Sequence, residues 1–132
     1  QMEGIKRMVA TYAAGPMGVE QMRHVMALQL YDASQLDDAL LAERAAVAAT
    51  QPANLFSTML VPNMTERLHE LKCPILGFWG TNDNFNPASG AMKILDHAPQ
   101  ARFIMLNRCG HWVQVEHREL FNRSCIDFLQ NG

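Results

Sequence analysis

The sequence predicts an α/β fold, in which helices cover the faces of a parallel sheet. Two short apolar runs, at 75–79 and 102–106, are each followed by a polar loop and then by a stretch with helical spacing. This alternation is typical of parallel strands joined by right-handed crossovers. The sequence before residue 72 has helical character instead. Because two strands alone do not make a stable sheet, the chain is expected to be one part of a larger fold.

Helices are expected throughout the first half of the chain. Apolar residues recur every three or four positions and predict a helix over about 17–31. Ser34 is expected to cap a second helix, because two acidic residues follow in what would be its first turn. That helix should end near Thr50, since the proline at position 52 disfavours helix in the residue before it.

One more short helix is expected at the end of the first half, and the second half then changes to strands. A helix over 64–71 is expected to face inward through Leu68 and Leu71. The run 75–79 is bounded by proline and glycine and is apolar on both faces, as in a strand buried within a parallel sheet. The run 102–106 predicts a second short strand.

A helix is expected after each strand. The first covers about 88–97, beyond a polar loop. The second covers about 116–130 and is amphipathic. Its apolar face is expected to contain Leu120, Phe121, Cys125, Phe128 and Leu129.

Composition excludes several classes of protein. The 132 residues are 48% hydrophobic and 18% charged, with a net charge of −2, as in ordinary soluble globular proteins. No Lys/Arg run points to nucleic acid, and no apolar run approaches the roughly 20 residues of a membrane span. Three cysteines without CxxC spacing argue against disulfides and zinc, so a cytoplasmic location is expected. The start at Gln1 suggests that a preceding segment is missing.

Two side chains with catalytic potential follow the predicted strands. Asp83 lies in the loop after the first strand and His111 in the loop after the second. Parallel strands end at the same edge of a sheet, so the two side chains can meet there. An aspartate bound to a histidine supports general-base catalysis, and this chain order also ends the Ser…Asp…His order of α/β hydrolases. The alternative is a solvated turn aspartate beside an ordinary loop histidine.

The sequences around these residues resemble a known family. Residues 79–87 read W-G-T-N-D-N-F-N-P, and residues 109–112 read C-G-H-W and are followed by Gln114, Glu116 and His117. Both segments resemble the α/β-hydrolase fold, and most closely the meta-cleavage product hydrolases. These bacterial enzymes split a carbon–carbon bond in ring-fission products of aromatic compounds. Parts of the first half, such as 31–34, are similar to the lid of the same enzymes.

The resemblance implies a division of the chain and a role for each matching residue. Residues 1–70 would form the helical lid, and residues 71–132 would be the C-terminal part of the hydrolase core. Asp83 and His111 would be the acid and the histidine of a catalytic triad. The residues implied to bind substrate are Arg44, at its carboxylate end, and Trp112 and Phe85, which would line the pocket.

The sequence departs from the family pattern in two places. Asn82 stands where the family often has a second aspartate, which leaves Asp83 as the matching triad acid. The Gly-x-Ser-x-Gly nucleophile motif is absent around all of the serines, which are Ser34, Ser57, Ser89 and Ser124. In the family this motif precedes the lid, so a missing N-terminal half is expected to supply it, and the chain alone is expected to be inactive.

The implied activity is hydrolysis of a vinylogous 1,5-diketone of the 2-hydroxy-6-oxo-hexa-2,4-dienoate type, in aromatic or steroid ring degradation. The resemblance implies no cofactor and a homo-oligomer. Two alternatives stay open. One is a different α/β hydrolase, such as an ester hydrolase or a haloalkane dehalogenase. The other is an inactive truncated fragment or a binding module.

Other chemistry is less well supported by the residues. Cys109 lies two positions before His111, but residues so close on a tight loop rarely align as nucleophile and base, so Cys109 is expected to be a buried small hydrophobe. A metal site built from His97, Asp96, His111 and His117 lacks the spacing of known ligand motifs, and no metal is expected.

Overall fold

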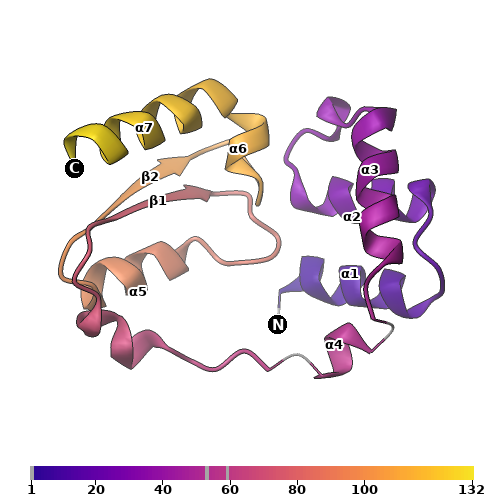
Figure 1. Ribbon diagram of the computed structural model, residues 1–132, viewed down its shortest axis with the longest axis horizontal. Helices are drawn as coiled ribbons and strands as arrows, with labels where there is room; N and C mark the ends of the chain where they lie inside the picture. Colours follow the sequence, from indigo (N-terminus) through magenta and orange to yellow (C-terminus); the bar gives the residue numbers. More distant parts are fainter. Residues whose placement is uncertain (1, 53, 59) are drawn as a thin grey trace.

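The computed structural model describes residues 2–52, 54–58 and 60–132, with a helical first half beside a two-stranded parallel sheet (Figure 1). In chain order the elements are α1 (Glu3–Ala13), α2 (Val19–Gln29), the 3-10 helix η1 (Ala33–Gln35), α3 (Asp38–Ala49), α4 (Leu55–Thr58), the 3-10 helix η2 (Thr65–Glu70), β1 (Ile75–Gly80), α5 (Ser89–His97), β2 (Ala101–Leu106), α6 (Val113–Glu116) and α7 (Arg118–Asn131).

The sheet has the predicted parallel arrangement. β1 and β2 pair from Ile75 opposite Ala101 to Gly80 opposite Leu106. Helix α5 connects them and lies on one face, and α7 covers the other (Figure 1). The expected α/β fold is therefore confirmed. β1 is half-buried along most of its length rather than enclosed, because within the described residues β2 is its only strand neighbour.

The core of the helical half is built on α2. This helix contacts both α1 and α3, and its buried side chains meet those of the following segments. The buried residues of this cluster are Met22, Met26, Leu30, Leu36, Leu41, Ala45 and Ala48. Trp112 and Val115, from the second half of the chain, also pack against it. The two halves thus share apolar contacts where the strands end.

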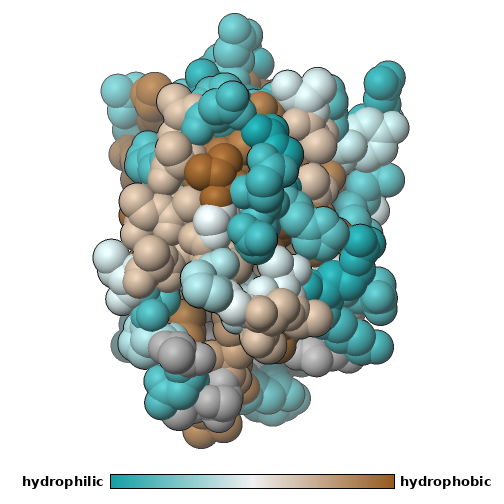
Figure 2. Space-filling view, turned by 90° about the vertical axis from the view of Figure 1, so that its right-hand side faces the viewer, coloured by the Kyte–Doolittle hydropathy of each residue, from teal (hydrophilic) through white to brown (hydrophobic). Residues whose placement is uncertain are grey.

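The outer surface of the helical half is mixed in character. Figure 2 shows apolar residues gathered on part of this face, with hydrophilic residues alongside. Val47 of α3 is among the exposed large hydrophobic residues. None of the helices in the described ranges is long and apolar enough to span a bilayer.

Some predicted helix boundaries in the first half are wrong. The predicted helices begin at residue 17, and α1 is not among them. Ser34 does not cap the second helix, since it lies within η1 and donates its N–H to Asp32 Oδ1 at 3.0 Å. Asp37 is the cap of α3 and accepts the N–H of Leu40 at 2.7 Å. Asp32 and Asp37 therefore each cap a separate turn, so α3 begins at Asp38 rather than directly after Ser34.

Two further predictions, for residues 64–71 and 116–130, need correction. The helix expected over 64–71 is the 3-10 helix η2, and Leu71 is exposed rather than facing inward. The helix expected over 116–130 begins at Arg118, because His117 has non-helical angles (φ −129°, ψ 47°) and separates α6 from α7. Leu129, expected on the apolar face, is 81% exposed.

Gly80 allows β1 to end against the loop that carries the histidine. A Cβ atom at this position would collide with the carbonyl oxygens of Cys109 and Gly110. We expect Gly80→Ala to lower the free energy of unfolding by about 1–3 kcal/mol, because backbone must move to admit the methyl group. Urea unfolding measures this change. In the control Gly18→Ala, the added Cβ meets only the flexible end of Gln21, so equal effects of the two variants would contradict this explanation.

Candidate active site

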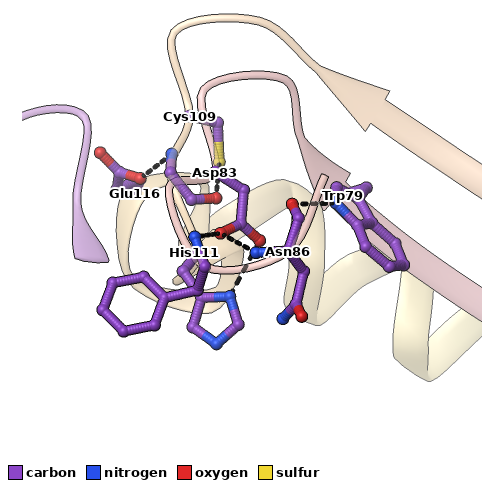
Figure 3. A network of polar contacts seen from close by, with 8 residues as sticks. Trp79, Asp83, Asn86, Cys109, His111 and Glu116 are labelled. Atoms are coloured by element: carbon purple, nitrogen blue, oxygen red, sulfur yellow. Dashed lines mark hydrogen bonds and ion pairs between the residues drawn. The ribbon is translucent and has the colours of Figure 1, made fainter. Parts of the chain in front are cut away.

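Asp83 and His111 meet at the carboxyl ends of the two strands. Asp83 lies three residues beyond the end of β1, and His111 lies in the loop after β2. Imidazole Nδ1 is 2.9 Å from Asp83 Oδ2, and Figure 3 shows the two side chains facing each other. The aspartate side chain is only 5% exposed, whereas the histidine side chain is 33% exposed. The pair therefore has a buried acid and an accessible base.

The second oxygen of Asp83 is held by the backbone of its own loop. Oδ1 accepts the N–H groups of Phe85 at 2.7 Å and of Asn86 at 3.0 Å. The carbonyl oxygen of Asn86 accepts in turn from Nε1 of Trp79 at 3.3 Å (Figure 3). The carboxylate orientation is thus fixed from both sides.

The surroundings of Asp83 favour its ionised form. Burial raises the pKa of this carboxyl, but the hydrogen bonds from His111, Asn86 and Phe85 together outweigh burial, and the net pKa is lowered. An ionised carboxylate can only accept hydrogen bonds, so Nδ1 of His111 is the donor. The proton on Nδ1 leaves Nε2 as the basic nitrogen of the neutral ring.

The backbone and the ring of His111 are both restrained. Its N–H donates to the carbonyl oxygen of Gln29, the last residue of α2, at 2.6 Å. Its ring stacks on Phe85, with centroids 5.3 Å apart and planes inclined by 27°. Phe85 is buried, and the carbonyl oxygen of the preceding Asn84 accepts the N–H of Gly4 in α1 at 3.0 Å. Both α1 and α2 therefore contact the loops of the pair.

Arg44 and Trp112 come together from the two halves of the chain. The guanidinium carbon lies 4.9 Å from the centroid of the indole ring. Both residues line a cavity of about 180 Å³, together with Tyr12, Met22 and Gln29 among others. A larger cavity of about 730 Å³ lies between α1, α3 and α4, and its lining contains neither Asp83 nor His111. The smaller cavity contains the sequence-predicted residues Arg44 and Trp112, but its lining likewise contains neither Asp83 nor His111.

Cys109 is fully buried, as the sequence analysis expected. Burial, followed by the negative charge of Glu116, raises the pKa of its thiol to about 12. The thiol is therefore protonated at neutral pH, which disfavours a role as nucleophile. Within the described ranges, no three His, Cys, Asp or Glu side chains gather as possible metal ligands.

Glu116 is the site residue whose role the sequence analysis missed. It appeared there only within the histidine motif, near the expected start of the last helix. Its carboxylate accepts backbone N–H groups from Gly110, next to His111, and from Tyr31 and Asp32 after α2. Its place in the motif was the available signal, but two of its three backbone partners, Tyr31 and Asp32, lie far away in the sequence.

Comparison with known proteins finds relatives that are named as dienoate hydrolases. No family model matches the chain. It is 35% identical over 139 aligned positions to the 2-hydroxy-6-oxo-6-phenylhexa-2,4-dienoate hydrolase of Burkholderia cepacia, covering 99% of this chain and 48% of that protein. It is 34% identical to the 2-hydroxy-6-oxononadienedioate/2-hydroxy-6-oxononatrienedioate hydrolase of Comamonas testosteroni, with the same coverage of 99% and 48%.

Solved structures agree with these sequence relatives. The meta-cleavage product hydrolase of Pseudomonas fluorescens IP01 superposes with a TM-score of 0.76 at 25% identity, over 98% of this chain and 50% of that structure. The fold and the acid–histidine pair at the strand ends define an α/β hydrolase. In both sequence and structure, nearly the whole chain is similar to meta-cleavage product hydrolases. The chain spans about half the length of the curated relatives it matches.

The lowered pKa of Asp83 predicts a pH-dependent contribution to stability. The folded-state pKa lies below the unfolded value of about 4, so this stability is present above that pH and is lost as the pH falls through the folded-state pKa. At neutral pH we expect Asp83→Asn to lower the free energy of unfolding by about 1.5–3 kcal/mol.

Urea titrations at neutral pH and below pH 4 check this prediction. The difference between wild type and Asp83→Asn should shrink in acid. Asp96→Asn is the matched control, because Asp96 is exposed on α5 and should show little difference at either pH. A difference for Asp83→Asn that stays constant with pH would contradict the ionised, hydrogen-bonded carboxylate.

Proposed function

We propose that this chain is part of an enzyme that hydrolyses a carbon–carbon bond in a vinylogous 1,5-diketone of the 2-hydroxy-6-oxo-hexa-2,4-dienoate type. The observation that carries the proposal is the Asp83–His111 hydrogen bond at the strand ends, in a chain whose relatives are named as hydrolases of such dienoates. The biological setting would be the breakdown of aromatic or steroid rings.

In the proposed mechanism, His111 transfers protons through Nε2, the nitrogen that does not contact Asp83. It first promotes ketonisation of the dienol and then activates a serine or a water molecule for attack on the ketone. Asp83 holds the ring in the required tautomer and stabilises the imidazolium that forms. The bond cleavage would release a 2-hydroxypenta-2,4-dienoate and a carboxylic acid.

The nucleophile would come from a part of the protein outside this chain. None of the serines here has glycines at both flanking positions of a nucleophile elbow. Two observations support a further half that completes the fold. Within the described sheet one edge of β1 has no strand neighbour, and the chain spans only about half the length of its relatives. On this proposal, residues 71–132 belong to the hydrolase core, residues 1–70 form its lid, and the chain alone is inactive.

Arg44 is the proposed partner of the substrate carboxylate. A guanidinium fork suits a bidentate contact with a carboxylate. Its position over Trp112 beside the 180 Å³ cavity supports this role. Trp112 would form a wall of the substrate pocket, and Phe85 would contribute to it beside the ring of His111. We further propose a cytoplasmic homo-oligomer that needs no cofactor.

Loss of His111 should abolish most of the activity of the full-length protein. We expect His111→Ala to lower kcat by about 10²–10⁴-fold, because general acid–base catalysis contributes a factor of that size. The assay follows the loss of absorbance of 2-hydroxy-6-oxo-6-phenylhexa-2,4-dienoate. His24→Ala is the control, since His24 is exposed on α2. Undiminished turnover by His111→Ala would refute the proposed function.

Replacement of Arg44 should weaken substrate binding. We expect Arg44→Gln to raise KM by about 10- to 100-fold, the equivalent of one or two charged hydrogen bonds. Arg7→Gln, an exposed position on α1, provides the control with the same change of charge. Steady-state kinetics with the same dienoate measures both variants. An unchanged KM for Arg44→Gln would show that Arg44 does not bind the substrate carboxylate.

A further inference from the structure

The carboxylate of Glu116 lies at a junction between the two halves of the chain. Glu116 is the last residue of the short helix α6 and is half-buried. Its Oε2 accepts the N–H of Gly110 at 2.6 Å, and its Oε1 accepts the N–H groups of Tyr31 at 2.7 Å and Asp32 at 2.9 Å. Figure 3 shows Glu116 beside the backbone of the loop that contains Cys109 and His111.

These hydrogen bonds form a closed ring around the histidine backbone. From Glu116 the ring passes to the N–H of Gly110 and then along the chain to His111. The N–H of His111 donates to Gln29 at 2.6 Å, and the chain continues from Gln29 to Tyr31, which returns to Glu116. The backbone N–H groups of Gly110 and His111 therefore each donate to an acceptor outside the loop that contains them.

The contact is too close for any side chain at position 110. A Cβ on Gly110 would collide with the carbonyl oxygen of Gln29 and lie 2.9 Å from the backbone nitrogen of Tyr31. The backbone after α2 therefore rests directly on the histidine loop. Without the carboxylate of Glu116, the N–H groups of Gly110, Tyr31 and Asp32 would lie close together and lose the acceptor that binds all three.

We infer that Glu116 is a positioning residue, which holds the backbone of His111 so that its imidazole meets Asp83. The expected effect on kcat rests on the proposed function. The expected effect on the hydrogen bond between His111 and Asp83 does not depend on that function. A displacement of about 1 Å in a catalytic group can reduce the rate by about 10²-fold. The carboxylate acts through backbone that precedes His111 and touches no reacting atom.

The test compares Glu116→Gln with Glu116→Ala in the full-length protein. A glutamine keeps one acceptor oxygen but presents an N–H₂ group in place of the other, so at least one backbone donor loses its acceptor. Alanine removes both oxygens. Glu119→Gln, an exposed glutamate in the first turn of α7, makes the same charge change without these contacts.

We expect kcat with the phenyl dienoate to fall by about 10- to 100-fold in Glu116→Gln while KM changes little. The proton NMR signal of His111 Nδ1–H, which donates to Asp83, should broaden in Glu116→Gln and vanish in Glu116→Ala. Circular dichroism should report unchanged helix content for Glu116→Gln and for the control.

The outcomes separate this inference from the proposed function. If Glu116→Gln keeps both the wild-type kcat and the His111 Nδ1–H signal, the positioning role is wrong. An equal loss in Glu119→Gln would overturn it as well. If the wild-type protein does not hydrolyse the dienoate but the His111 Nδ1–H signal still broadens in Glu116→Gln, the proposed function fails and the positioning role stands. Should Glu116→Ala unfold, the glutamine variant alone decides the result.

Discussion

The structure depends on the packing of the C-terminal end of α2 against the loop after β2. At this contact the carbonyl oxygen of Gln29 binds the N–H of His111 at 2.6 Å, and Gly110 lets the two backbones approach. Trp112 and Val115 add apolar contacts to the same helical core. The backbone of His111 is therefore positioned by both halves of the chain, and the strand that precedes it supplies only part of its support.

The loop that contains Asp83 is also held by hydrogen bonds to backbone N–H groups. Asp83 uses one oxygen for the backbone of its own turn and the other for the histidine. Because the carboxylate is almost fully buried, each of these hydrogen bonds matters for keeping it ionised. The nearby thiol of Cys109 shows the opposite behaviour, since burial and neighbouring negative charge keep it protonated. The carboxyl of Asp83 is thus ionised, whereas the thiol of Cys109 close by is protonated.

Predicted and observed helix boundaries differ where two local signals compete and where no local signal exists. Ser34 and Asp37 are both good helix caps, and the aspartate is selected because Asp32 already holds the turn that contains Ser34. The break at His117 has no turn residue to announce it. There the carboxylate of Glu116 is turned toward backbone donors more than 80 positions earlier in the chain, which no periodicity reports.

The sequence by itself determined the α/β class, the two parallel strands, most of the helices and the pairing of Asp83 with His111 as a candidate. These features follow from local periodicity and from the rule that parallel strands end at one edge. Only the tertiary structure decided the ring of hydrogen bonds through Glu116, the stacking of Phe85 on His111 and the approach of Arg44 to Trp112. The physical reason is that each of these contacts joins segments distant in sequence, whose meeting is set by packing of the whole chain.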